Sequence, residues 1–238
     1  WSQSEKCYVC YLRTFTKTEE GGFRTVSRTT SPDFINWTDL TEMTYGDTPP
    51  EHLYTNQTHA YFRAPHIYIA IAARFMPGRR ILNAEQADKV GSEGTYSGDC
   101  SDTILMTTRG GTQYERTFME AFVRPGIGLG NWTSRTNYPA RCVVPTGEDT
   151  MSMYVQRNYG QPTHHLQRLA MRTDGFISVN APYAGGSFRT KPFTFSGKNL
   201  VINYSTSAAG SIWVEVQDDT GAPISGFAQA DCDEIIGD

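Results

Sequence analysis

The chain has 238 residues, of which 12% are aromatic and 19% are charged, with 22 glycines and 12 prolines. This composition is typical of a globular protein rich in turns and aromatic strands, and it excludes a disordered tail and a coiled coil. The formal charge of −4 argues against non-specific nucleic-acid binding, which needs a basic face to displace counterions from phosphate, so no polyanion partner is implied.

Membrane and compartment signals are weak. The longest apolar run, Ile67 to Ala73, is far too short to cross a bilayer, so we expect no membrane partner. The chain opens at Trp1 without a methionine and almost inside a strand pattern, which predicts that the natural N-terminus lies further upstream; no signal peptide is visible. The five cysteines lack metal spacing, and we expect them to be buried free thiols.

Strand patterns dominate from the start of the chain. Lys6 to Leu12 is rich in β-forming residues, and Phe23 to Thr30 alternates after a Gly-Gly turn, so the two are predicted to form an antiparallel pair. Ser31 to Thr38 then supplies a turn that contains Pro and Asp, with a Trp predicted to pack between strands. A similar closure recurs at Gly126 to Thr133.

Further short runs of β-branched, aromatic or aliphatic residues are predicted strands: Tyr61 to Phe75, Ser101 to Thr108, Arg116 to Val123, Arg141 to Pro145, Met151 to Gln156 and Leu166 to Met171. Gly110 and Gly111 are predicted to form a hairpin turn. Only Asn83 to Val90 reads as helix, with Asn83 as its N-cap. Short antiparallel strands closed at intervals by a turn and a Trp predict repeated four-stranded sheets, as in propeller blades.

The pattern changes near Thr173 to Phe176, which predicts a domain boundary at about residue 175. Beyond it, Gly185 to Thr190, Leu200 to Tyr204 and Ser211 to Val216 alternate cleanly between polar turns, a pattern typical of a β-sandwich. These runs supply strands for only part of a sandwich. The chain then stops at Asp238 with an unprotected edge, so the sandwich is predicted to be incomplete.

Several motifs carry a resemblance to a known family: Ser31 to Trp37, Tyr61 to Tyr68, Ser101 to Met106, Phe118 to Gly126, Thr206 to Val216 and Pro223 to Phe227. Across nearly its whole length the chain resembles the five-bladed propeller glycoside hydrolases of the furanosidase type (families 32, 43 and 68). It is most similar to a bacterial family-32-like group with a C-terminal β-sandwich. The resemblance implies an all-β chain with the later blades of a propeller in residues 1–175 and an incomplete β-sandwich in residues 176–238.

The resemblance also implies an activity. We expect an exported glycosidase, extracellular or periplasmic, that acts on a plant or algal polysaccharide or oligosaccharide without a cofactor. Its chemistry would use carboxylates in the propeller channel, because one group must protonate the leaving oxygen while another acts on the opposite face of the sugar. The family's base aspartate and its arginine-aspartate-proline triplet have no match in this chain, so we expect the base in blades that precede it, and activity of the chain by itself stays an open question.

Two carboxylates are the catalytic candidates. Glu120 lies between Met119 and Ala121 in an aromatic setting, and such an apolar environment is what a general acid needs. The alternative is a structural ion pair of Glu120 with Arg116 or Arg124. Asp102 follows a serine and precedes an apolar strand, where it points into a channel or caps a turn.

The remaining candidates would bind the sugar, because a subsite needs a flat aromatic ring beside amide, imidazole or guanidinium groups. The resemblance places Arg63 and His66 on the innermost strand that lines the channel, although His66 could equally be a hydrogen-bonded core residue. Residues 54–59 and 158–165 mix aromatic and polar side chains in loops. The candidate substrate-binding residues are Arg63, His66, Asn56, His59, Arg124, Tyr159, Gln161 and His164.

Other interpretations stay open. A non-catalytic carbohydrate-binding propeller would keep the arginines and aromatics and lack the paired acids. A six-bladed sialidase-like scaffold fits less well, because Trp37 comes too soon and an arginine triad cannot be placed. His164 and His165 lack a third ligand at zinc spacing, so we expect no metal site there. The sequence leaves the oligomeric state open.

Overall fold

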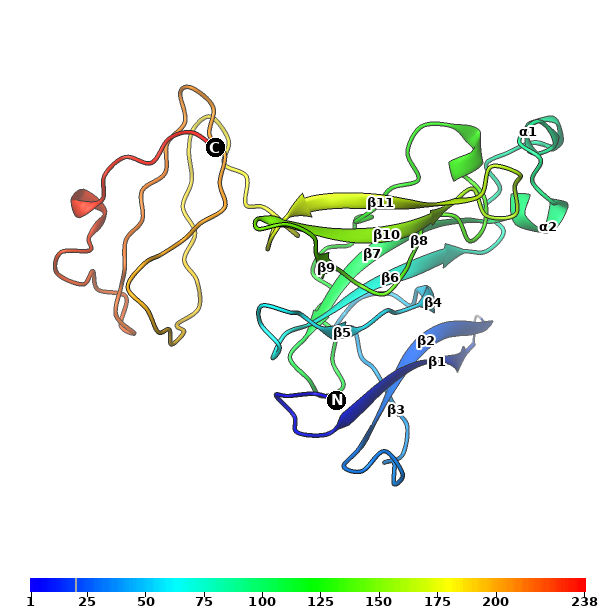
Figure 1. The fold of residues 1–238 in the computed structure, drawn as a ribbon, viewed down its shortest axis with the longest axis horizontal. Coiled ribbons are helices and arrows are strands. Elements are labelled where there is room, and N and C mark those ends of the chain that lie inside the picture. Colours follow the sequence, from blue (N-terminus) through cyan, green and yellow to red (C-terminus); the bar gives the residue numbers. More distant parts are fainter. Residues whose placement is uncertain (20) are drawn as a thin grey trace. The chain divides into compact units, whose positions relative to one another are not determined.

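The computed structural model describes residues 1–19 and 21–238. The chain divides into two compact units, Trp1–Met171 and Arg172–Asp238. Strands far outnumber helices, and the three sheets of the first unit are antiparallel (Figure 1). The prediction of an all-β chain is therefore confirmed.

The first sheet is built on a long hairpin. Strands β1 (Tyr8–Thr18) and β2 (Gly21–Ser31) pair antiparallel from Tyr8 opposite Ser31 to Thr18 opposite Gly21, which confirms the predicted pair. Strand β3 (Thr41–Glu42) adds to the free edge of β2. The turn between β2 and β3 is organised by Asp33, whose carboxylate accepts the amides of Ile35 at 2.9 Å and Asn36 at 2.7 Å. Trp37 was predicted to pack between strands, which is wrong, because its indole donates to Phe34 O within the turn and the side chain is 38% exposed.

The middle sheet has the order β4–β6–β5, with β7 on the other edge of β6. Its strands are β4 (His52–Thr55), β5 (His59–Ala60), β6 (Tyr68–Met76) and β7 (Cys100–Thr108). The predicted strand from Tyr61 begins only at Tyr68, because a turn around Pro65 brings Ile67 N to Ala64 O at 2.8 Å. The predicted strand Arg116 to Val123 is reduced to isolated bridges of Glu115 and Val123 with β7.

The third sheet has the order β11–β10–β8, with β9 also paired to β10. Its strands are β8 (Tyr138–Pro139), β9 (Val144–Pro145), β10 (Thr150–Arg157) and β11 (His165–Arg172). Helix α1 (Ala84–Lys89) confirms the predicted helix and its cap, because the Asn83 side chain accepts the Gln86 amide at 2.9 Å. A shorter helix, α2 (Gly94–Ser97), and a 3-10 turn at Leu129–Asn131 follow in connecting segments.

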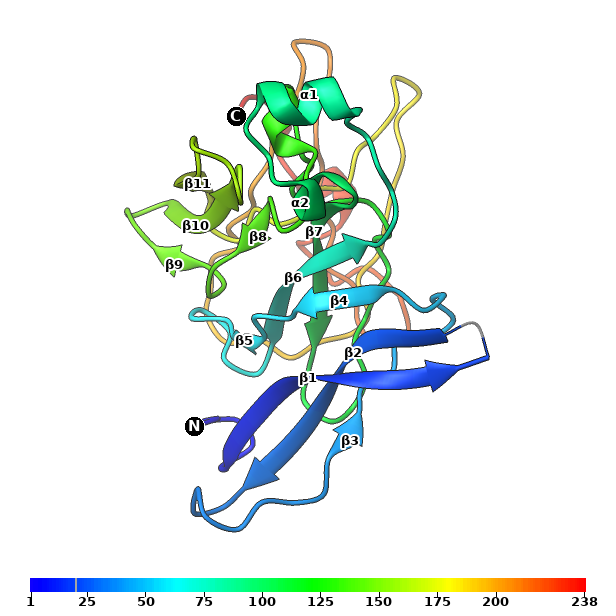
Figure 2. The same cartoon turned by 90° about the vertical axis from the view of Figure 1, so that its right-hand side faces the viewer.

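The middle sheet is buried on both faces, between the other two sheets (Figure 2). On one face, alanines of β6 and Ile104 and Met106 of β7 pack against Val26 and Met43 of the first sheet. On the other, the Ser101 hydroxyl donates to Thr136 O at 2.5 Å, and the Thr103 hydroxyl donates to Asn137 O. The sheets stack face to face and do not close into a ring within the described residues.

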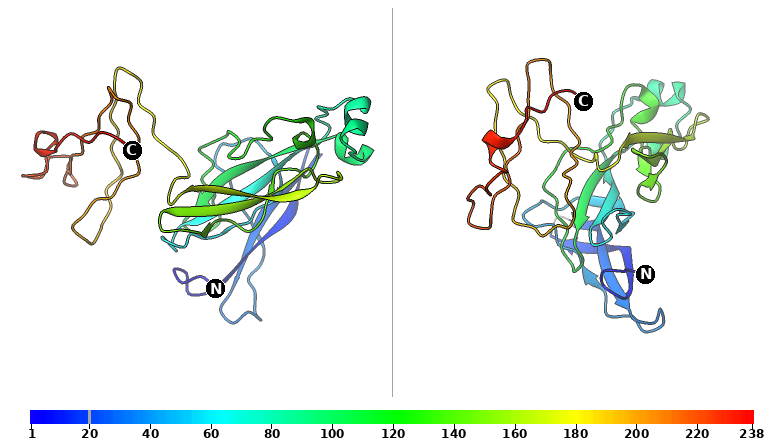
Figure 3. Two further views of the ribbon diagram at one scale, coloured as in Figure 1. Left: turned by 45° about the horizontal axis from the view of Figure 1, so that its top comes forward. Right: turned by 60° about the vertical axis from the view of Figure 1, so that its left-hand side comes forward.

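The second unit departs from the sequence prediction. Beyond Arg172 the structure describes no regular strand, so the three strands predicted between Gly185 and Val216 are not formed (Figure 3). Only isolated bridges occur, between Ile212 and Ile235 and between Gln217 and Pro223. The reason is that the apolar side chains of these runs find no core: Val201, for example, is 88% exposed. Across the described part of both units, no helix has the length and apolar character needed to cross a membrane.

Candidate functional site

Strand β6 presents two kinds of chemistry on its two faces. Consecutive strand residues point to opposite faces of a sheet. Arg74 lies opposite Leu53 of β4 and Asp102 of β7, whereas Phe75 lies opposite His52 and Ser101. A network of ion pairs therefore forms on the Arg74 face, and an aromatic cluster forms on the Phe75 face.

Arg74 is the centre of the ion-pair network. Its Nε and Nη2 donate to the two oxygens of Asp102 at 2.9 and 2.7 Å, and its Nη1 donates to Glu51 Oε1 at 2.7 Å. Arg116 Nε donates to the other Glu51 oxygen at 3.1 Å. The bonds from Asp102 raise the pKa of Arg74 and outweigh the opposing effect of burial, so the guanidinium stays charged. Both carboxylates are thereby held by arginine.

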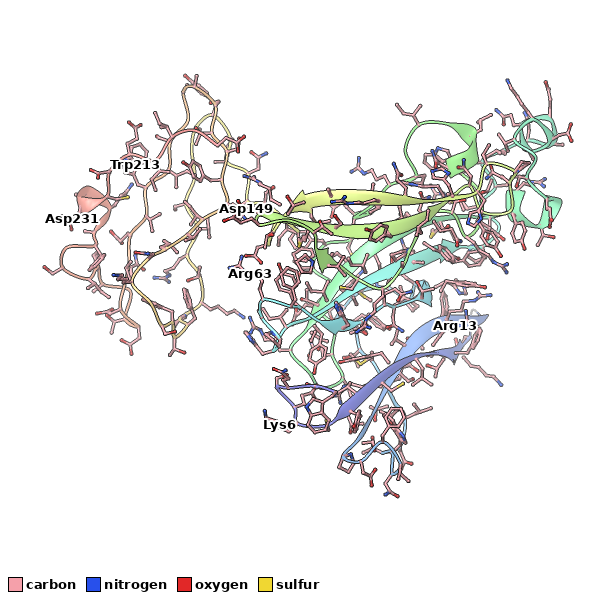
Figure 4. The ribbon with its side chains drawn as sticks, in the orientation of Figure 1. Lys6, Arg13, Arg63, Asp149, Trp213 and Asp231 are labelled. Atoms are coloured by element: carbon pink, nitrogen blue, oxygen red, sulfur yellow. The ribbon has the colours of Figure 1, made fainter. Side chains whose placement is uncertain are left out.

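On the opposite face three arginines converge on one aromatic ring. The guanidinium carbons of Arg13, Arg24 and Arg135 lie 4.8, 5.5 and 5.6 Å from the centre of the Tyr54 ring. Cations at such distances are attracted by the electron-rich face of the ring. Arg13 also donates to Tyr54 O at 3.4 Å, from the end of β1 that approaches β4 (Figure 4). These three arginines, Tyr54 and Tyr138 are called the Tyr54 cluster below.

Neighbouring rings hold the arginines in place. Arg24 Nη1 lies 3.3 Å from His52 Nδ1, and its guanidinium lies 5.0 Å from the centre of the Phe75 ring. Burial lowers the pKa of His52, and the positive charge of Arg24 lowers it further, so the imidazole is neutral at pH 7 and accepts from Arg24. Arg135 Nη1 donates to the Tyr96 hydroxyl at 3.3 Å.

Tyr138 is the buried member of the Tyr54 cluster. Its ring centre lies 5.1 Å from that of Tyr54, and the residue is only 8% exposed. Burial raises the pKa of its hydroxyl, which stays protonated and able to donate. Among the described residues this hydroxyl has no hydrogen-bond partner. A buried polar group of this kind is rare and calls for an explanation.

The two predicted catalytic carboxylates lie in different settings. Asp102 belongs to the ion-pair network and caps no turn. Glu120 is exposed, and it follows Met119, whose carbonyl accepts from Arg74 Nη1 at 3.1 Å and from Arg116 Nη2 at 3.3 Å. Arg116 pairs with Glu51, so the alternative pairing of Glu120 with Arg116 is not formed.

The predicted channel residues lie on the surface. Arg63 and His66 are exposed and belong to the connection between β5 and β6, where Figure 4 labels Arg63. Arg124 is exposed in the segment after Val123. The structure places none of these three in the Tyr54 cluster.

The predicted residues of the β4–β5 turn have local partners. Asn56 Oδ1 accepts the amide of Thr58 at 2.9 Å. His59 is half-buried, and burial lowers its pKa, with a smaller contribution from Arg141. Its Nδ1 is buried without a partner in the described part of the chain.

The predicted residues of the β10–β11 turn have two roles. The Tyr159 ring lies 5.2 Å from Tyr96 and 5.6 Å from His164, and Arg135 lies 5.7 Å above it, so Tyr159 borders the Tyr54 cluster. His164 is exposed beside it. Gln161 is buried and donates to Gly130 O at 2.8 Å and to Thr133 Oγ1 at 3.0 Å, so it stabilises the turn.

The first unit also has a groove outside the Tyr54 cluster. A shallow groove of about 340 Å³ runs beside the ion-pair network, between residues 45–49 and 113–119, and Arg116 lines its wall. Within residues 1–19 and 21–238, no three His, Cys, Asp or Glu side chains are grouped closely enough to hold a metal ion.

Sequence reasoning missed most of the Tyr54 cluster. Tyr54 belongs to a loop that was singled out for its mixture of aromatic and polar residues, whereas Arg13, Arg24 and Arg135 come from three distant segments. Arginines next to aromatic residues were the available signal, and only the pairing of the sheets shows which of them meet. No family model, curated protein or solved structure matches this chain.

Proposed function

We propose that this chain is a glycoside hydrolase-like protein that binds a polysaccharide or oligosaccharide at the Tyr54 cluster. The convergence of guanidinium groups on the neighbouring rings of Tyr54 and Tyr138 carries this proposal. Sugars present apolar C–H faces that pack on aromatic rings, and hydroxyls that accept from guanidinium and phenol donors. The same proposal includes export to the periplasm or the extracellular space, where such polymers occur.

The stacking of the sheets supports the propeller part of the proposal. Three antiparallel sheets follow each other along the chain, and each packs face to face on the next, as neighbouring blades do. We therefore propose that they are the later blades of a five-bladed propeller. We also propose that the second unit is part of a β-sandwich; the isolated bridges Ile212–Ile235 and Gln217–Pro223 support this.

Glu120 is the proposed general acid. Its side chain is exposed and no ion pair joins it to a described residue. Because Met119 beside it contacts Arg74 on the face of β6 opposite the Tyr54 cluster, Glu120 would act on a polymer that extends beyond the cluster. Asp102 stays in the proposal as a carboxylate that Arg74 holds in position through both oxygens.

Hydrolysis of arylated arabinofuranosides, xylosides and fructosides tests the enzymatic proposal. We expect an active protein to release the aryl group, and Glu120→Gln to lower the rate about 100-fold or more, the size of a lost general acid. Glu148→Gln, at another exposed glutamate, is the matched control and should keep full activity. Equal activity of the two variants would rule out Glu120 as the acid.

A non-catalytic carbohydrate-binding module is the second candidate. It is favoured by the ion-pair network, in which all four oxygens of Glu51 and Asp102 accept from arginines. Such a module predicts no release from any reporter and retarded migration in gels that contain neutral polysaccharide. Tyr54→Ala should abolish the retardation, and Tyr183→Ala, at a fully exposed tyrosine, should preserve it. Migration unaffected by every polysaccharide would contradict carbohydrate binding altogether.

A further inference from the structure

We propose that the Tyr54 cluster recognises an anionic substituent on its sugar ligand, a carboxylate or a sulfate ester. This inference rests on the proposed carbohydrate binding and specifies its ligand class. Planar guanidinium groups bind both kinds of oxyanion through paired N–H donors.

The first argument is uncompensated positive charge. The described ion pairs of the first unit engage Arg28, Arg74 and Arg116, and none engages Arg13, Arg24 or Arg135. Three like charges nevertheless gather around one ring, at 4.8 to 5.6 Å from its centre. Like charges gathered around one ring repel one another, so an arrangement of this kind is stabilised by an anion placed among them.

The nearby acids do not compensate this charge. Asp99 acts electrostatically on Tyr138, but its carboxylate accepts the amide of Gly78 at 2.6 Å. Glu93 acts on Tyr96 at the border of the cluster. Neither forms an ion pair with the three arginines in the part of the chain that the structure describes.

The second, independent argument is the Tyr138 hydroxyl. The side chain is more than nine-tenths buried, lies against Tyr54, and keeps its proton because burial raises its pKa. Arg135 and Arg24 are close enough to act on this hydroxyl electrostatically. Leaving a buried donor unpaired is costly. The hydroxyl oxygen is closed to solvent, so an oxyanion held by the arginines would accept this donor once the ring of Tyr54 moves aside.

The net charge of the chain does not oppose the inference. The value of −4 is a sum over 238 residues and excludes a protein that is basic overall. Recognition of one charged substituent depends on the local field of the three arginines and not on the net charge of the chain. The cluster is therefore compatible with an acidic protein.

The test compares polysaccharides that share a backbone and differ in charge. Binding of the full chain is measured by affinity electrophoresis in dextran against dextran sulfate, and in methyl-esterified against de-esterified polygalacturonate. We expect binding to the charged member of at least one pair to be about tenfold or more tighter than to its neutral counterpart. The two pairs distinguish a sulfate ester from a carboxylate.

Variants assign the charge preference to the cluster. Arg24→Gln and Arg135→Gln should each remove most of it, whereas Arg80→Gln and Arg109→Gln, at exposed arginines elsewhere, should preserve it. Tyr138→Phe removes only the unpartnered hydroxyl; it should leave unfolding in urea unchanged or improved and should weaken binding of the charged polymer alone.

The outcomes separate this inference from the proposed function. Equal binding of charged and neutral members overturns the anion preference and leaves carbohydrate binding standing. If Arg80→Gln and Arg24→Gln reduce the preference for the charged polymer equally, the preference comes from the surface charge as a whole. That result overturns its assignment to the Tyr54 cluster. Absence of binding to all four polymers overturns the anionic ligand and argues against the carbohydrate proposal, whose reporter hydrolysis is a separate measurement.

Discussion

Replacing Arg74 by methionine tests the central charge network of the first unit. The substitution keeps the length and apolar character of the stem, and it removes two bonds to Asp102, one to Glu51 and one to Met119 O. Removing one partner of a buried ion pair costs about 3 to 5 kcal/mol. The side chains of Arg74 and Asp102 are 16% and 17% exposed, so water partly solvates the abandoned carboxylate. We therefore expect a loss of about 3 kcal/mol, at the lower end of that range.

Urea unfolding followed by far-UV circular dichroism measures this loss, because the described regular strands that give the signal lie in the first unit up to Arg172. Thermal unfolding should show a lower Tm, by about 2 to 4 °C per kcal/mol for a chain of this size. Arg80→Met, at an exposed arginine, is the control and should change stability by less than about 0.5 kcal/mol.

A double-mutant cycle identifies the cause. Asp102→Leu alone leaves Arg74 with Glu51, whereas the double variant leaves no orphaned charge at position 102 and Glu51 keeps Arg116. The double variant should therefore be more stable than the sum of the single losses predicts, by about 1 kcal/mol or more. Strictly additive losses would refute the reasoning that Arg74 acts through its pairing with Asp102.

Three further predictions concern single groups. Burial raises the pKa of the Cys142 thiol to about 11, which leaves little thiolate at pH 8. Cys142 should therefore resist a disulfide reagent until the chain unfolds, and rapid reaction of all five thiols in the native protein would contradict this. Hydrogen bonds from Asn36 lower the pKa of Asp33, so they should stabilise the turn fully above the ordinary Asp pKa of about 3.9 and lose this effect as the pH falls through the lower pKa of the folded state. An NMR titration of the Asp33 carboxyl with a midpoint at or above about 3.9 would refute this prediction. Gly160→Ala should destabilise the protein by about 1 to 3 kcal/mol, because the glycine has a φ of +70° and an added Cβ would clash with the Tyr96 ring. Urea unfolding unchanged from the wild type would contradict this close approach.

Local patterns were enough to predict much of the first unit. The alternation of Phe23 to Thr30, the Asn83 cap and the apolar run after Ser101 predicted β2, α1 and β7, because each element is determined by neighbouring residues. The runs after residue 185 show the same alternation and form no regular strand. Alternation gives a strand an apolar face, but pairing requires a partner sheet that buries this face, and a run of sequence does not reveal whether one is present.

The candidate site was harder to predict for a related reason. Asp102 was noticed for its position before an apolar strand, yet its partner Arg74 comes from the preceding strand and is identified only by register. The Tyr54 cluster draws on β1, β2, β4 and the segment before β8. The spacing of these residues along the chain does not predict that they lie together, because their contacts depend on how separate sheets stack.

The middle sheet has one irregularity that lies at the centre of the Tyr54 cluster. Leu53 pairs with Arg74 and Thr55 with Ala73, so Tyr54 is an additional residue that β6 does not match. Its neighbour Leu53 is buried in the core, whereas Tyr54 pairs with no residue of β6. A substitution at this single position can therefore alter the proposed ligand preference without breaking a pair of the β4–β6 ladder.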